Sequence, residues 1–439
     1  MARPISVKNI ASPYGLGLIS YVVFLCAWVF PPGAYTEITA EPDNMFLDWK
    51  TFVFYTACVL AFFAGVWAMG RFGPPNPAED PPPLKVSSPL LLLLGPLLYA
   101  IVFCGGFIGT VGNQIDVFGL LASQQGGLIK QAMHSGEIKY AVFGPAPLFT
   151  TGVIWWAWYM SRRLVLDGTE RLIFRVVFFV TIVVDLAACI GTVDRTSLMP
   201  LLAGMMVIWA DRKARVAGLT LSRTFLGAIG GGAIVVGTFL SLSFIRGFRG
   251  MKLLELSLMG YTVVSYNRLT ALLNGSMHYQ YGGKGAYLVQ YMTTATKVNA
   301  LLGLQHYWPS AADLWQSEFT STLLAGLNPA FIWSGAFGYI YSELGWGALV
   351  YIALVGLFAG WAWARFHAGT ILGRVLYPWI AFWILFWLGW NPLFANYFVN
   401  LLTCTAVIAL HMYLFAPEAL RNPLRVRPAR RVGAARQAA

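Results

Sequence analysis

Three arginines lie at the ends of long apolar runs of the sequence. Arg195 lies in GTVDRTSLMP, between two apolar runs, and Arg246 and Arg249 lie in SFIRGFRGMK, where another run ends. A cation held at that depth costs free energy unless an anion offsets it. The arginine fork binds two phosphate oxygens at once and keeps its charge. These side chains, with Arg268 downstream, predict a diphosphate site at the level of the lipid headgroups.

The same arginines also have structural interpretations. Each could extend to a lipid headgroup, which explains a single arginine well and the set of three less well. They could also pair with Asp194, Asp185 or Glu255. Asp185 lies inside an apolar run, TIVVDLAAC, where a carboxylate faces the interior of a helix bundle. For Asp185, an ion-pairing role and a proton-relay role are equally open.

A reaction in which a hydroxyl group attacks also needs a general base, which accepts the hydroxyl proton. His278 and His306 rank above His134, because they share the segment 246–335 with the arginines, and each could take a proton near neutral pH. Glu343, in YSELGW, begins an apolar run. A carboxylate there ordinarily caps a helix, and it could also orient a hydroxyl. We predict His306, His278 and Glu343 as catalytic candidates.

Several kinds of site are missing from the sequence. It has no GxxxxGK[ST], HExxH or GxSxG motif and no DxD pair. Five cysteines lie in apolar runs without CxxC spacing, which predicts small buried side chains rather than a disulfide or a zinc site. We therefore expect chemistry without a metal ion or another cofactor.

The composition indicates which elements position these side chains. Hydrophobic residues make up 58% of the 439 residues and charged residues only 11%, against about 25% charged in soluble domains. The net charge of +12 is spread in short clusters between apolar runs, which is typical of membrane topology and argues against binding to nucleic acid. The chain is predicted to be an all-α, polytopic membrane protein.

Apolar runs predict about ten membrane-spanning helices, each near the roughly 20 residues that cross the hydrocarbon. We place them near residues 14–30, 51–70, 88–110, 141–160, 172–193, 196–210, 224–245, 336–364, 371–390 and 394–415. In a ten-span arrangement the basic clusters all fall on one side, which is then cytoplasmic, together with both termini. The acidic first loop and the segment 246–335 fall on the other side.

This arrangement divides the chain into four parts. Residues 1–245 hold the first seven spans, 246–335 form a large helical periplasmic loop, 336–415 hold the last three spans, and 416–439 are a basic tail. The loop is predicted to contain helical pieces at 251–273 and 286–304 and to pack over the mouth of the bundle. Residues 111–140 predict an interfacial helix, interrupted at Gly126-Gly127.

Three passages resemble the polysaccharide repeat-unit polymerases of bacterial envelopes, the Wzy-type O-antigen polymerase group, which is related to O-antigen ligases. They are GTVDRTSLMPLLAGMMVIWADRK, SFIRGFRGMKLLELSLMG and LNPAFIWSGAFGYIYSELGWGALVYIALVGLFAG. Arg249, ten residues and then Gly260 fit an arginine–ten–glycine pattern of such polymerases. Where the family has an aspartate–phenylalanine–glycine stretch, this chain has Ser342-Glu343-Leu344-Gly345.

The resemblance implies a glycosyltransferase of the GT-C type in the bacterial inner membrane, with its active site on the periplasmic face. The donor would be a glycan on undecaprenyl diphosphate and the acceptor a lipid-linked repeat unit, with a chain-length regulator as a further partner. Arg195 and Arg249 would stabilise the leaving diphosphate. A histidine or Glu343 would take the hydroxyl proton, and aromatic residues of the loop would stack on sugars.

Three alternatives stay open at this level. An O-antigen ligase would pass the finished glycan to lipid A core by the same chemistry with another acceptor. Another envelope glycosyltransferase would also use a lipid-linked sugar. A transporter or flippase would need intramembrane polar residues along a path through the bundle, for which Asp185 is the one candidate.

Overall fold

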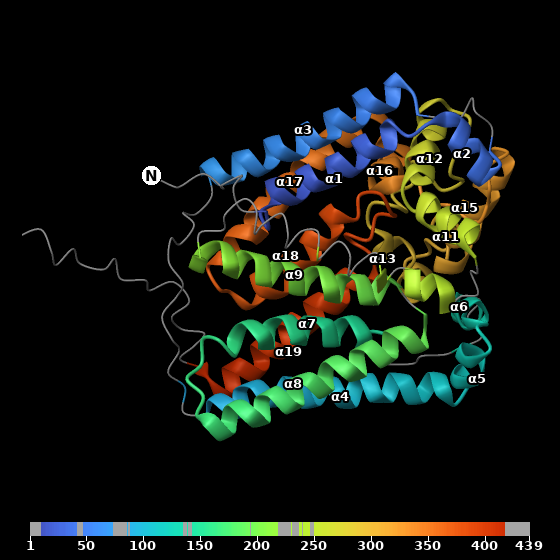
Figure 1. The fold of residues 1–439 in the computed structure, drawn as a ribbon. Helices are drawn as coiled ribbons and strands as arrows, with labels where there is room; N and C mark the ends of the chain where they lie inside the picture. Colours follow the sequence, from blue (N-terminus) through green and yellow to red (C-terminus); the bar gives the residue numbers. More distant parts are fainter. Residues whose placement is uncertain are drawn as a thin grey trace, which may run out of the picture.

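The structure is a computed structural model that describes residues 10–41, 47–72, 86, 88–134, 138, 143–193, 195–217, 230, 237–238, 240–245 and 250–417. Within these residues the chain is helical and contains no strand. Long helices lie side by side in a bundle, and shorter helices gather at one end of it (Figure 1). The predicted all-α class is confirmed.

Five helices of the described chain are long and apolar enough to cross a membrane. They are α3 (Trp49–Phe72), α4 (Pro89–Gly112), α8 (Gly168–Gly191), the stretch Gly335–His367 and α19 (Asn396–Phe415). The stretch Gly335–His367 contains α16 (Gly335–Leu344) and α17 (Ala348–His367). A sixth span results if α1 (Pro13–Trp28) and α2 (Pro32–Thr39), which meet at 89°, are taken together.

Two shorter apolar helices occupy the middle of the bundle. They are α7 (Ala146–Met160) and α18 (Ile371–Leu385), and almost every residue of both is buried. Both pack against α9 (Arg195–Ala217). In Figure 1 these three helices lie between a layer with α1, α3 and α17 and a layer with α4, α8 and α19. Because their neighbours shield α7 and α18 from the surroundings, these helices meet protein along most of their length.

The ten predicted spans correspond closely to helices, although their number stays a prediction. Nine of the ten predicted ranges contain a described helix. The remaining range, 224–245, lies mostly outside the described residues. Among the described residues, five or six helices meet the length and composition of a span.

Large apolar side chains on the outside of the long helices indicate what surrounds them. Exposed examples on α1, α3, α4, α8, α17 and α19 are Leu18, Val22, Leu60, Leu98, Val102, Val176, Phe179, Val350, Leu354 and Leu410. Water around so many exposed apolar groups would cost free energy, whereas lipid tails would not. The bundle therefore has the surface of a membrane protein.

Helices α3 and α17 are in close contact, and this contact fixes the position of α16, which leads into α17. A Cβ atom added at Gly65 would clash with the carbonyl oxygen of Ala353, and one added at Gly356 would clash with that of Phe62. Small residues let membrane helices approach in this way. A short 3₁₀ turn (Gly345–Gly347) joins α16 to α17 and begins at Gly345, whose φ of +55° suits glycine. This junction places α16 at the end of the bundle.

The segment 246–335 forms most of the end layer. It contains α11 (Met251–Gly260), α12 (Val263–Leu273), α13 (Gln290–Thr293), α14 (Thr296–Leu301) and α15 (Ala311–Leu324). Every residue of α12 is buried, because this helix packs against α1, α3 and α16. The prediction that this segment packs over one mouth of the bundle agrees with this arrangement; the side of the membrane stays a prediction.

Some predicted boundaries were wrong. The predicted helix 251–273 is broken at Tyr261-Thr262, and 286–304 contains only the short helices α13 and α14. Residues 111–140 include α5 (Val117–Ala122) and α6 (Gly126–His134), so Gly126 starts a helix instead of interrupting one. The left-handed Gln124, at φ +58°, makes the break two residues earlier. The predicted tail 416–439 lies almost wholly outside the described residues.

Candidate functional site

A buried carboxyl group, that of Glu318, lies on α15 in the end layer. The helix starts with a capping box, in which the Ser310 hydroxyl accepts from the Asp313 amide at 3.1 Å. Its buried face carries Leu314, Ser317, Glu318, Ser321 and Thr322. Helical spacing places these residues on one side, so α15 turns a polar face inward. Glu318 is only 8% exposed.

Three tyrosines surround the Glu318 carboxyl group. The Tyr339 hydroxyl on α16 donates to Oε2 of Glu318 at 3.0 Å. The ring of Tyr339 stacks on Tyr279 at 5.2 Å, and Tyr287 lies 5.2 Å from Tyr339 and 5.1 Å from Tyr279. The Tyr279 hydroxyl donates to the carbonyl oxygen of Ile332 at 3.1 Å. Rings packed in this way hold the carboxyl group in one position.

Burial changes the proton equilibrium of this cluster. It raises the pKa of Glu318 to about 8, although the hydrogen bond from Tyr339 acts in the opposite direction. Burial also raises the pKa of Tyr279 and of Tyr287, so these hydroxyls keep their protons at neutral pH. A carboxyl group that titrates near neutral pH can both take and give a proton, as general acid–base chemistry requires.

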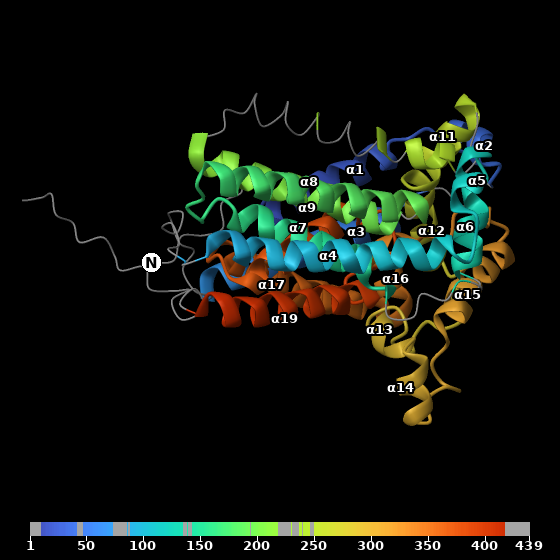
Figure 2. The ribbon, with the colours of Figure 1, turned by 90° about the horizontal axis from the view of Figure 1, so that it is seen from below.

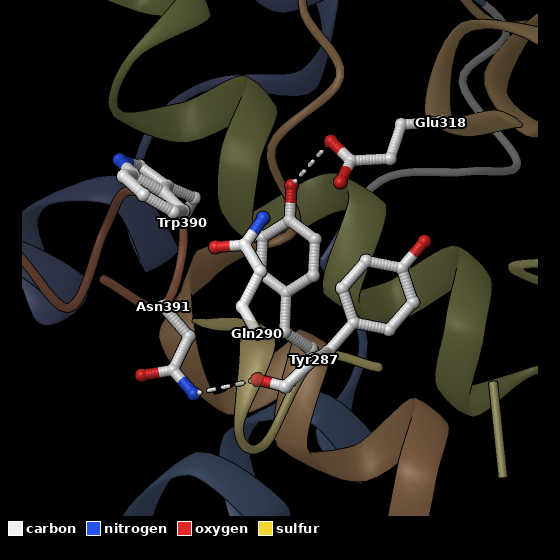
Figure 3. A pocket seen from close by; sticks show the side chains of 6 residues that line it. Tyr287, Gln290, Glu318, Trp390 and Asn391 are labelled. Carbon is white, nitrogen blue, oxygen red and sulfur yellow. Dashed lines mark hydrogen bonds between the residues drawn. The ribbon is translucent and has the colours of Figure 1, made fainter. Parts of the chain in front are cut away.

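A small pocket opens beside Glu318 (Figure 3). It is lined by Tyr287, Gln290, Glu318, Tyr339, Trp390 and Asn391. Its volume of about 10 Å³ is room for one water-sized group. The Asn391 side chain bridges two neighbours, donating to the carbonyl oxygen of Tyr287 at 3.2 Å and accepting from the Trp383 indole at 2.9 Å. The pocket can therefore hold one hydroxyl group against a carboxyl group and amides.

Glu343, a predicted catalytic residue, lies near this pocket and anchors its wall. Its Oε2 accepts from the Gly285 amide at 2.7 Å and its Oε1 accepts from the Tyr287 amide at 2.8 Å. Both carboxylate oxygens thus hold the turn that presents Tyr287. These contacts favour a positioning role for Glu343, and its predicted contact with an acceptor stays a prediction.

We expect Glu343→Gln to loosen this turn, because an amide has only one accepting oxygen. Loss of one hydrogen bond to a charged group costs about 1.5–3 kcal/mol. Hydrogen exchange at residues 283–290 should speed up, while exchange in α7 should not change. Unchanged exchange in the turn would show that Glu343 does not hold it. The control is Glu255→Gln, at an exposed carboxyl group of α11.

Arg268, predicted to bind a diphosphate, lies in a buried network with Glu41. Its guanidinium pairs with both carboxylate oxygens of Glu41, with Nη1 at 2.7 Å from Oε2. Its Nε donates to the carbonyl oxygen of Phe331 at 2.8 Å, and Nη2 donates to that of Asn328 at 3.0 Å. Arg268 is fully buried, so its fork is already occupied by the protein.

Further contacts complete the Arg268–Glu41 network. Asn267 donates to the Tyr35 hydroxyl at 2.8 Å, and Tyr35 donates to Glu41. The amide of Asn328 donates to Glu41 at 2.9 Å. Burial by itself would raise the pKa of Glu41, but the hydrogen bonds and charge of Arg268 outweigh burial and lower it. The network joins Glu41, two residues after the end of α2, to α12 and to the loop before α16.

The other predicted site residues are not brought together by the described structure. His278 and His306 are exposed and do not line the Glu318 pocket. Arg195 is the first residue of α9, but its side chain lies outside the described residues, as do Arg246 and Arg249. Asp185 accepts a hydrogen bond from Thr151 at 2.9 Å within the bundle. The predicted arginine cluster stays a prediction.

Glu318 and its three tyrosines were not among the site residues predicted from the sequence. The segment 246–335 contains only three acidic residues, Glu255, Asp313 and Glu318. Asp313 follows Ser310 at capping spacing, whereas Glu318 follows Leu314 by one helical turn and shares its face. That spacing was the available signal for an inward carboxyl group.

Comparisons with protein-family models, with curated proteins and with solved structures found no match to this chain.

Proposed function

We propose that this chain is a membrane glycosyltransferase that polymerises lipid-linked oligosaccharides into O-antigen or a related surface polysaccharide. The donor is a growing glycan on undecaprenyl diphosphate, and the acceptor is a lipid-linked repeat unit. In this proposal the end layer, with Glu318, lies on the periplasmic face of the bacterial inner membrane, both termini are cytoplasmic, and the bundle has a GT-C-like fold of about ten spans.

The observation that carries the proposal is the Glu318 pocket. Glycosyl transfer to a hydroxyl group requires a base that accepts the hydroxyl proton. Glu318 is a carboxyl group with a pKa near 8 at a pocket with room for one hydroxyl group. Its lining residues Glu318 and Tyr339 belong to α15 and α16. Both helices lie in the layer where the long apolar helices end (Figure 1), which suits a substrate anchored in the membrane.

The reaction assigns a role to each part of the site. The acceptor oxygen forms a bond to the anomeric carbon of the donor, and the bond from that carbon to the lipid diphosphate breaks. The hydroxyl proton passes to the Glu318 carboxylate. The leaving diphosphate takes up negative charge at the headgroup level, where Arg195 and Arg249 stabilise it in this proposal. Tyr339 keeps Glu318 in place through its hydrogen bond.

Deletion of the gene in its native host tests the reaction class. A polymerase predicts that long surface glycan is replaced by single repeat units on lipid A core. An O-antigen ligase instead predicts that long glycan persists on the lipid carrier and is missing from the core. Unchanged surface glycan of full length would contradict both.

We expect Arg195→Ala and Arg249→Ala each to abolish polymer while leaving the protein in the membrane. Loss of one preorganised donor to a developing oxyanion costs about 10²–10³ in rate. Glycan length in cells that carry each variant at matched protein levels is the measurement. Arg171→Ala, an exposed arginine in the first turn of α8 near the predicted cytoplasmic side, is the control. Full polymer in both site variants would rule out the diphosphate role.

A further inference from the structure

Residues 289–307, which we name the arm, leave the end layer sideways. Figure 2 shows α13 and α14 projecting beyond α19, across the direction of the long helices. The root of the arm is fixed to the start of α19, because the Tyr291 amide donates to the carbonyl oxygen of Phe394 at 3.3 Å. The arm therefore leaves the protein at the level where an apolar, membrane-length helix begins.

The arm exposes several large apolar side chains. Leu301 is 86% exposed and Leu302 61% exposed, and exposed neighbours are Val289, Met292, Val298 and Tyr307. A helix pair that protrudes into water would not retain such a surface at low cost. Its polar neighbour Asn299 is instead buried and donates to the carbonyl oxygen of Thr293 at 2.6 Å.

The charge of the arm favours one partner. Lys297 is exposed on α14. Lys284, which precedes the arm, lies 5.3 Å from the ring centre of Tyr281 and 5.9 Å from that of Tyr307, a residue of the arm. No aspartate or glutamate occurs from residue 284 to residue 312. Exposed leucines with lysine and tyrosine are typical of segments that lie in the headgroup region of an anionic bilayer.

We propose that the arm is an interfacial anchor that lies on the bilayer surface, with Leu301 and Leu302 inserted among the lipids beside α19. The arm contacts α19 through α13, and α19 exposes Leu402 near that contact. Gln290, the first residue of α13, lines the Glu318 pocket. Anchoring would thus hold the pocket at the headgroup level, a consequence that rests on the proposed function.

Site-directed fluorescence tests the anchor independently of activity. Leu301→Cys and Ala312→Cys would each carry an environment-sensitive label in the full chain with Cys26→Ser, since the other four cysteines are buried. Ala312 is an exposed residue at the start of α15. The labelled proteins are reconstituted in vesicles of phosphatidylethanolamine and phosphatidylglycerol, with either nitroxide lipids or aqueous iodide as the quencher.

We expect nitroxide lipids to quench the label at residue 301 by about half, as for groups buried a few ångströms into the interface, and iodide to have little effect on it. The label at 312 should show the reverse. Strong iodide quenching at 301 without lipid quenching would overturn the proposal, because the arm would then stand in water. Protection of 301 from both quenchers would also overturn it, because protein would then cover the leucines.

Discussion

Glu318→Gln is expected to slow glycosyl transfer by about 10²–10⁴-fold and, at the same time, to stabilise the folded protein at pH 8. The rate falls because glutamine cannot accept the hydroxyl proton. The fold persists because the glutamine oxygen can still accept the hydrogen bond from Tyr339, which is 3.0 Å from Oε2 of Glu318. Opposite effects on activity and stability distinguish a catalytic carboxyl group from one that supports the fold.

The stability gain should depend on pH in a defined direction. Burial raises the pKa of Glu318 from 4.5 to about 8, so the folded protein holds this proton more tightly than the unfolded chain. The stabilising effect of that proton is complete below pH 4.5 and is lost as pH rises toward 8. Glutamine has no such titration. The variant should therefore match the wild type at pH 4 and unfold at a higher temperature than the wild type at pH 8.

Thermal unfolding at about pH 4 to 9 and transfer rates at about pH 5 to 9 are the measurements. The wild-type rate should rise with pH until about pH 8, as the carboxylate form becomes populated. Glu37→Gln, at an exposed carboxyl group, is the matched control and should change neither quantity. His278→Ala and His306→Ala should keep most activity. If a histidine variant instead loses activity and Glu318→Gln keeps it, the base is that histidine.

Arg268→Met is expected to destabilise the protein by about 3–5 kcal/mol, because it leaves Glu41 buried and unpaired. The side chains of both partners are buried, and Glu41 also accepts a hydrogen bond from the amide of Asn328. The thermal midpoint in detergent should therefore fall strongly. Lys50→Met, an exposed cation of α3, should have a much smaller effect.

The double variant Arg268→Met/Glu41→Gln separates a structural role from substrate binding. It removes both charges, and the glutamine oxygen can still accept from Asn328, so part of the lost stability should return. If Arg268 only supports the fold, activity should return along with stability. Recovered stability without activity would show that the guanidinium also contacts the diphosphate. A double variant less stable than Arg268→Met would contradict the paired arrangement.

The sequence predicted the helical class and the positions of most long helices, because apolar runs report directly on a hydrocarbon environment. The roles of individual charges were harder to predict. Arg268 resembled an external cation available to a ligand, yet its partner Glu41 lies 227 residues away in the chain. Such a pairing depends on how the residues that follow α2 pack against α12, and the local sequence around Glu41 or Arg268 does not contain that information.

The surroundings of Glu318 could not be predicted from the local sequence either. The sequence of α15 mixes polar and apolar residues without a clear apolar face. The tyrosines that bury the carboxyl group of Glu318 come from α16 and from the turns before α13. Glu343 was predicted as a site residue because it starts an apolar run, but its oxygens hold the turn at residues 285–287. The local sequence pattern predicted Glu343, whereas the packing of the helices places Glu318 at the pocket.

The most direct test uses purified protein in vesicles with a defined undecaprenyl-diphosphate repeat unit. The proposed function predicts a ladder of lengthening glycans whose rate rises with pH toward 8 and which Glu318→Gln reduces by about 10²-fold or more. A wild-type protein that forms no ladder, or a Glu318→Gln variant that forms it at the wild-type rate, would contradict the account.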